Sequence, residues 1–103
     1  MHKSYQEQTL TEQQAEELAE FFRALSDPTR VRIIAALLED EFNVGALADI
    51  VGVSESAVSH HLRTLRQMRL VRGRKLGREV FYCLDDDHVR DLFQRGLDHV
   101  LHG

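Results

Sequence analysis

The sequence contains one cysteine, Cys83, and one proline, Pro28. A single cysteine excludes a disulfide-stabilised secreted fold and suits a reducing compartment. No apolar run approaches the length of a membrane span, and the polar residues 1–10 lack the apolar segment of a signal peptide. We therefore expect a cytoplasmic protein with no membrane partner, in which Cys83 is a buried or half-buried thiol.

The 103 residues suffice for one domain, and nearly half of them are apolar. A modest core is therefore possible without stabilising cross-links. We expect a flexible tail at residues 1–10 and one folded domain at residues 11–103.

The net charge of -4 conceals one basic segment. Residues 58–80 carry seven Lys and Arg side chains against one Glu, whereas residues 1–57 carry four basic and eleven acidic side chains. Such a chain can bind a polyanion through the basic segment while the remaining surface repels it. The alternative is a charged helix face that is merely solvated.

Apolar spacing predicts a mainly helical chain. A first helix is expected at residues 11–25, with Thr11 as N-cap, and a second at residues 28–40, capped by Asp27 and starting with Pro28. The apolar faces of these two helices are predicted to comprise Leu18, Phe21, Phe22 and Leu25 in the first and Val31, Ile34, Leu37 and Leu38 in the second.

A short helix, a glycine turn and a longer helix follow. We expect helices at residues 44–51 and 55–68, separated by Gly52 and capped by Ser54. Inward positions Leu47, Ala48 and Val51 in the first and Val58, Leu62 and Leu65 in the second leave a polar outer face. This order is typical of a helix-turn-helix, whose second helix enters the major groove of DNA. A small helical scaffold with an incidental glycine turn is the alternative.

A basic β-hairpin is expected next, with strands at residues 70–74 and 79–84 and a tip at residues 75–78. The fold class is thus mainly α with a small β-hairpin, a winged helix-turn-helix. The side chains predicted to contact DNA bases or backbone are Ser54, Ser56, Ser59, His60, Arg63, Lys75 and Arg78.

The final helix, residues 85–102, carries four metal-binding side chains: Asp86, His88, His99 and His102. His88 and His99 share a helix face but lie roughly 16 Å apart along the axis. Because zinc ligands lie about 2 Å from the ion, one helix cannot gather all four groups. Two antiparallel helices can, so the spacing predicts a homodimer with Asp86 and His88 of one chain and His99 and His102 of the other at each site. The alternative is solvated histidines with Asp86 serving only as an N-cap.

Three imidazoles and one carboxylate favour Zn(II), and four ligands complete a tetrahedron with no open position. Such a site fits sensing and not catalysis, so we expect no enzyme activity. Co(II) is the expected surrogate, whereas Ni(II) prefers more ligands.

The motifs resemble those of the ArsR/SmtB family of bacterial metal-responsive repressors. The matching stretches are residues 24–30 (ALSDPTR), 53–62 (VSESAVSHHL) and 69–71 (RLV). The resemblance implies a dimer, with first and last helices at the interface, that binds operator double-stranded DNA when metal-free and releases it on metal binding. The family's cysteine site would fall in residues 41–47, which contain no cysteine.

The family's other common site has the pattern Asp-x-His, ten residues, then His-x-x-His or Glu, and Asp86, His88, His99 and His102 match it. The resemblance also implies a hydrogen bond from His99 to the backbone carbonyl of Arg69, coupling metal to DNA, and metal efflux or sequestration genes as targets. Two other functions stay open: regulation of DNA without metal, and zinc binding or buffering.

Overall fold

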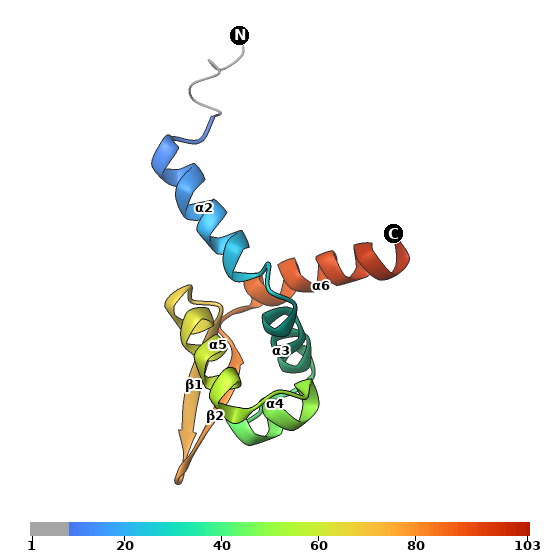
Figure 1. The fold of residues 1–103 in the computed structure, drawn as a ribbon. Helices are drawn as coiled ribbons and strands as arrows, with labels where there is room; N and C mark the ends of the chain where they lie inside the picture. The colour runs from blue at the N-terminus through green and yellow to red at the C-terminus, as the bar shows by residue number, and fades with distance from the viewer. Residues whose placement is uncertain (1–8) are drawn as a thin grey trace.

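The structure is a computed structural model that describes residues 9–103. In this range it contains five helices and two strands, arranged as shown in Figure 1. The elements are α2 (Glu12–Ala24), α3 (Pro28–Glu39), α4 (Val44–Val51), α5 (Glu55–Gln67), β1 (Val71–Leu76), β2 (Glu79–Leu84) and α6 (Asp87–His102). The predicted fold class, mainly α with a small β-hairpin, is confirmed. Most of the expected tail, residues 1–8, lies outside the described residues.

The first two helices begin with the caps that the sequence predicts. Thr11 and Gln14 form a capping box at the start of α2, and the Asp27 carboxylate accepts a hydrogen bond from the Arg30 backbone N–H at the start of α3. Pro28 occupies the first turn of α3, where a missing N–H costs nothing. These local interactions explain why the helix starts were predictable.

The hydrophobic core lies between α3, α4, α5 and the base of the hairpin. Its side chains are Ala24, Ile33, Ile34, Leu37, Leu47, Ala48, Val51, Val58, Leu62, Leu65, Leu70, Val71 and Leu84. The predicted buried face of α3 omitted Ile33, which is fully buried. It included Val31 and Leu38, which are only half-buried. The reason is that α3 packs against α4, α5, β2 and α6 at once.

The hairpin is longer than the sequence predicts. Strands β1 and β2 pair from Val71–Leu84 to Leu76–Glu79, which leaves only Gly77 and Arg78 in the turn. Gly77 has a φ of 63°, which allows this two-residue connection. The expected end of the first strand at Arg74 is therefore wrong by two residues. Lys75 lies within β1 and not in the turn.

Helices α2 and α6 project away from this core (Figure 1). Ala24 is the one buried residue of α2, and α6 has none. The predicted apolar stripe of α2 is largely uncovered, since Leu18 and Phe22 are exposed and Phe21 and Leu25 are half-buried. Helices α2 and α6 thus present apolar surface that a single copy does not bury.

Candidate DNA-binding surface and metal ligands

The turn between α4 and α5 is fixed by backbone and side-chain hydrogen bonds. Gly52 adopts a left-handed conformation with a φ of 78°, and its N–H donates to the Ala48 carbonyl at 2.8 Å. Arg32 of α3 donates to the Val51 carbonyl at 2.8 Å. Ser54 then caps α5 by accepting from the Ala57 N–H. These contacts hold α5 in one orientation relative to α4.

One face of α5 is buried and the other is polar and exposed. Val58, Leu62 and Leu65 lie in the core. The exposed positions include Ser56, Ser59, His60 and Arg63, as predicted, together with Arg66. Ser54 is exposed as well, although its oxygen is already used by the helix cap. The structure therefore places the α5 candidates on one accessible helix, with hydroxyl, imidazole and guanidinium groups that can reach bases or phosphates.

The β-hairpin is tied to the start of α4. Phe42 and Tyr82 exchange backbone hydrogen bonds of 3.2 and 2.8 Å, forming a bridge beside β2. Arg74 forms an ion pair with Glu41 at 2.7 Å, and Asn43 donates to Glu79 at 2.9 Å. No local sequence pattern indicates these contacts, because the partners lie more than thirty residues apart.

The two predicted hairpin contacts, Lys75 and Arg78, are exposed. Lys75 projects from β1 and Arg78 lies in the turn. Arg74 belongs to the same basic segment, but Glu41 neutralises it. The free positive charge of the hairpin is therefore smaller than the sequence count indicates.

Asp86 and His88 meet at the start of α6. The Asp86 Oδ1 atom accepts from the Val89 N–H and caps the helix, so α6 begins after Asp86 and not at residue 85 as expected. His88 Nδ1 lies 3.8 Å from the same oxygen, and its side chain is 98% exposed. Capping uses one carboxylate oxygen, which leaves Oδ2 and both imidazole nitrogens available to a metal ion.

His99 and His102 lie in the last turn of α6, and both are exposed. They are separated from Asp86 and His88 by most of the helix length. Within residues 9–103, no three His, Cys, Asp or Glu side chains are close enough to hold a metal ion. One chain therefore holds the four predicted ligands as two pairs, one at each end of α6, and the pairs are too far apart to share one ion.

Arg69 lies in the bend between α5 and β1, with a φ of 58° that is unusual for a residue other than glycine. It is exposed, and its N–H donates to the Arg66 carbonyl. In the described part of one chain, His99 makes no hydrogen bond to the Arg69 carbonyl, and α6 packs against α3 and β2. The expected pairing stays a prediction.

An apolar groove of about 360 Å³ runs between α2 and α6. Its lining residues are Phe22, Leu25, Val31, Leu92, Phe93, Gly96, Leu97 and Val100. We call this the α2–α6 groove. Val100 is 80% exposed and Phe22 is 51% exposed. Apolar patches of this kind mark protein–protein contacts when they are continuous.

Two further sequence predictions concern Cys83 and the membrane. Cys83 is a free, half-buried thiol in β2, as expected. None of the helices within residues 9–103 combines the length and apolar character needed to cross a membrane.

Comparison with known proteins identifies the family. The family described as "Bacterial regulatory protein, arsR family" matches residues 27–72. The chain is 47% identical over 98 residues to the transcriptional repressor SmtB homolog of Synechocystis sp., covering 95% of this chain and 74% of that protein. It is 42% identical over 91 residues to the cadmium resistance transcriptional regulatory protein CadC homolog of Staphylococcus aureus, covering 87% and 75%.

A solved structure from Mycobacterium bovis matches the fold. It is described as a homodimeric winged helix-turn-helix DNA-binding domain, and it superposes with a TM-score of 0.78 at 25% identity, covering 91% of this chain and 94% of that one. The relatives are transcriptional regulators and not enzymes. With its helix-turn-helix, its hairpin wing and this extent of identity, the chain belongs to the ArsR/SmtB family of metal-sensing bacterial transcriptional repressors.

Proposed function

We propose that this chain is a cytoplasmic, homodimeric repressor that binds operator double-stranded DNA without metal and releases it when Zn(II) binds. Each zinc site would combine Asp86 and His88 of one chain with His99 and His102 of its partner. Release would derepress genes of metal efflux or sequestration. One observation carries this proposal: two pairs of side chains able to bind metal, Asp86 with His88 and His99 with His102, lie at opposite ends of the exposed helix α6.

The DNA-binding part of the proposal is supported by the exposed face of α5 and by the hairpin. Serine, histidine and arginine side chains project from α5 on the side opposite its buried leucines. Lys75 and Arg78 add positive charge on the adjacent hairpin. Because each contacted phosphate releases counterions, operator affinity should fall steeply as salt rises.

The dimer is supported by the α2–α6 groove. Its apolar lining comes from both terminal helices, and a second copy is a partner of matching chemistry. The homodimeric neighbour from Mycobacterium bovis has the same fold. Pairing through α6 in antiparallel orientation sets the start of each α6 beside the end of the partner's α6.

The metal part is supported by the donor set and its accessibility. His88, His99 and His102 are exposed, and Asp86 retains one carboxylate oxygen beyond its capping bond. Three imidazoles and a carboxylate suit a tetrahedral Zn(II) site, and Co(II) would serve as a surrogate. Because histidine must be neutral to ligate, metal affinity should weaken at acidic pH.

Coupling between the sites follows from subunit arrangement. Ligation joins the start of one α6 to the end of the other and favours one quaternary arrangement, so metal and operator weaken each other by the same free energy. We propose that His99 contributes through a hydrogen bond to the Arg69 carbonyl, since the second nitrogen of a ligating histidine usually has such a partner. A His99 variant that keeps metal affinity should then lose the DNA response, and a normal response would exclude this route.

The first experiment titrates zinc into the protein–operator complex and follows DNA binding by fluorescence anisotropy. Wild type should bind without metal and dissociate with zinc, and His88→Ala and His99→Ala should each remain bound. A regulator that works without metal predicts binding that zinc does not change. A zinc-buffering protein predicts no specific binding at all.

Mixed dimers test the intersubunit geometry directly. One variant carries Asp86→Ala and His88→Ala, and the other carries His99→Ala and His102→Ala. Each homodimer should lack a complete site, whereas the mixed dimer should regain one site and bind one zinc ion. Failure of the mixture to bind zinc, with dimers still formed, would exclude ligands shared between chains.

A further inference from the structure

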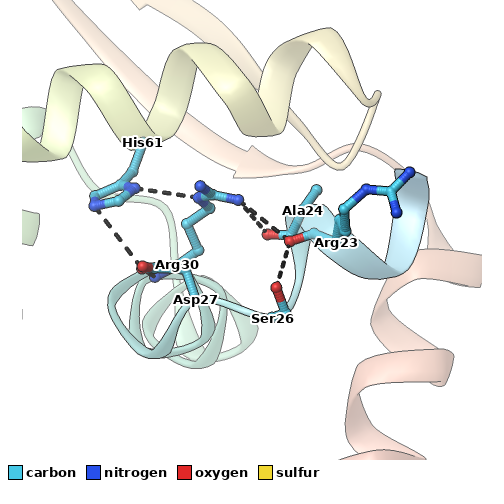
Figure 2. A network of polar contacts seen from close by, with 6 residues as sticks. All are labelled: Arg23, Ala24, Ser26, Asp27, Arg30 and His61. Atoms are coloured by element: carbon cyan, nitrogen blue, oxygen red, sulfur yellow. Dashed lines mark hydrogen bonds and ion pairs between the residues drawn. The ribbon is translucent and has the colours of Figure 1, made fainter. Parts of the chain in front are cut away.

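A polar network joins α2, α3 and α5 at the corner where the first two of these helices meet. Figure 2 shows its members, which are Arg23, Ala24, Ser26, Asp27, Arg30 and His61. Arg30 donates from Nε to His61 Nδ1 at 3.2 Å and from Nη1 to the Ala24 carbonyl at 3.0 Å. We call this the corner network. It connects the end of α2 to the recognition helix α5 through one side chain of α3.

The chemistry of the network is specific. A guanidinium can only donate, so His61 Nδ1 accepts and its ring proton lies on Nε2. That nitrogen lies 3.9 Å from Asp27 Oδ2, the same oxygen that caps α3 through the Arg30 N–H. The His61 side chain is 17% exposed, so few water molecules could take the place of its protein partners if these were removed. The position of His61 therefore depends on its hydrogen bond from Arg30, with Asp27 nearby on the other side of the ring.

Within residues 9–103, the network is also the main polar contact between α2 and the other helices. Helix α2 buries only Ala24, at its C-terminal end, and the remaining helix projects away from the core. Arg30 Nη1 donates to two backbone carbonyls at the C-terminal end of α2, those of Ala24 at 3.0 Å and Arg23 at 3.5 Å. A movement of α2 would therefore change the contacts of the Arg30 guanidinium, which is also hydrogen-bonded to α5.

We propose that Arg30 and His61 are positioning residues that couple the orientation of α2 to that of the recognition helix. They hold α5 at the angle that operator binding needs, and they carry the change in subunit arrangement from the α2–α6 groove to the DNA-facing helix. This inference rests on the proposed function, in which α2 lies at the dimer interface and metal changes the subunit arrangement.

The test compares two His61 variants in the full-length dimer. His61→Asn places an amide oxygen at the δ position and keeps an acceptor for Arg30, whereas His61→Leu keeps bulk and removes the acceptor. We expect His61→Leu to weaken operator binding about tenfold, as loss of one buried hydrogen bond allows, and to reduce the zinc-induced loss of affinity. His61→Asn should restore both quantities to within about threefold of wild type.

A double-mutant cycle supplies the matched control. Arg30→Gln and His61→Leu should be non-additive in operator affinity, because each breaks the same contact. Arg32→Gln removes the same charge from α3 but breaks the bond to the Val51 carbonyl, so its effect should add to that of His61→Leu. Urea unfolding of every variant shows separately whether it folds. For any variant that is too unstable to bind DNA, the same double-mutant cycle is measured on the free energy of unfolding.

The outcomes separate the two proposals. Wild type that binds no operator overturns the proposed function and, with it, this inference. Wild type that binds and responds to zinc, while Arg30→Gln and His61→Leu act additively or leave the zinc response intact, overturns the inference alone. An Asn variant as defective as the Leu variant also overturns it, because bulk and not the hydrogen bond would then matter.

Discussion

Two regions of the molecule differ in how much of their apolar surface one chain covers. We call the elements from α3 to β2, which include the helix-turn-helix and its wing, the completed region. We call the terminal helices α2 and α6 the incomplete region. Every core residue except Ala24 lies between Ile33 and Leu84, and the turn, the caps and the hairpin are closed by hydrogen bonds within the chain. By contrast, α6 buries no residue and α2 buries one. The helix-turn-helix and its hairpin are therefore closed by contacts within one chain, whereas the terminal helices leave apolar surface uncovered.

The location of the proposed ligands gives this difference its meaning. Asp86, His88, His99 and His102 all lie on or beside α6, the element whose surroundings one chain leaves open. A site there would report on subunit arrangement, because its two halves would come together only in the proposed dimer. A site inside the completed core would bind metal in every arrangement and could not shift the equilibrium between them.

The largest effect is expected from the completed region. Ile34 has no exposed surface, so Ile34→Ala should lower the free energy of unfolding by about 2–4 kcal/mol through lost burial and a residual cavity. Urea denaturation at several protein concentrations should give the same loss throughout, because the contact is within one chain. A loss that disappears at high concentration would contradict the division between the two regions.

The next effect concerns the incomplete region. Val100 lines the α2–α6 groove, so Val100→Asp should leave the monomer folded but raise the dimer dissociation constant about a hundredfold, since the change is repeated in both copies. Sedimentation velocity over a range of concentrations measures it. Ile50→Asp is the matched control, because Ile50 is also exposed but lies on α4, away from the groove. Equal dimerisation by Val100→Asp and wild type would place the interface elsewhere.

A third prediction separates the two roles of Asp86. Asp86→Ala should cost about 1 kcal/mol of stability, because the cap of α6 is lost, while Asn caps as well as Asp and should cost little. Both substitutions remove the anionic ligand and should weaken zinc binding. Thermal unfolding without metal and a competition titration with a zinc chelator measure the two effects. Unchanged zinc affinity in Asp86→Asn would show that capping is the whole role of this residue.

The parts of the molecule that the sequence predicted well depend on neighbours along the chain. Caps at Thr11, Asp27 and Ser54, the glycine turn at Gly52 and the apolar spacing of α5 each involve residues within four positions. The hairpin turn was misplaced because a two-residue and a four-residue connection both satisfy the pattern around Gly77. The spacing of the four predicted ligands showed that one helix cannot bring them together. It could not give their positions in a dimer, because those depend on how two copies pack.

Contacts between distant residues were out of reach for the same reason. Glu41 and Arg74 are separated by thirty-three positions, and nothing in either neighbourhood indicates that they pair. The hydrogen bond between Arg30 and His61 spans thirty-one positions, and nothing in the sequence around either residue indicates it. Such pairs depend on the final packing angles of helices and strands, which no local pattern fixes.

A smaller effect is expected at the corner that joins the two regions. The hydrogen bond from the backbone N–H of Arg30 holds the pKa of Asp27 below its ordinary value of 3.8; burial opposes this shift, and the Thr29 N–H and the Arg30 guanidinium add to it. A lowered folded-state pKa stabilises the protein above the unfolded value and loses that contribution as the pH falls through the folded value. The stability advantage of wild type over Asp27→Asn should therefore shrink between roughly pH 5 and pH 2 in urea denaturation. A difference that stays constant over this range would contradict the assignment.

The smallest effect is expected at the wing, where we expect the ion pair between Glu41 and Arg74 to compete with DNA for the Arg74 side chain. Glu41 and Arg74 are both partly exposed, so Glu41→Gln should change stability by at most about 0.5 kcal/mol. The Phe42–Tyr82 bridge and the Asn43–Glu79 bond still hold the hairpin. The freed Arg74 should then contact one more phosphate, raise operator affinity at low salt, and steepen the slope of log K against log salt by up to about 0.9.

Arg74→Gln is the matched variant for this prediction. If Glu41 keeps Arg74 away from DNA, Arg74→Gln should leave the wild-type salt slope unchanged, and adding it to Glu41→Gln should cancel the steepening. A shallower slope in Arg74→Gln alone would mean that Arg74 already contacts a phosphate despite its partner. In that case the ion pair with Glu41 would not keep Arg74 from DNA, and this intrachain contact would not limit the positive charge that the wing offers to phosphates.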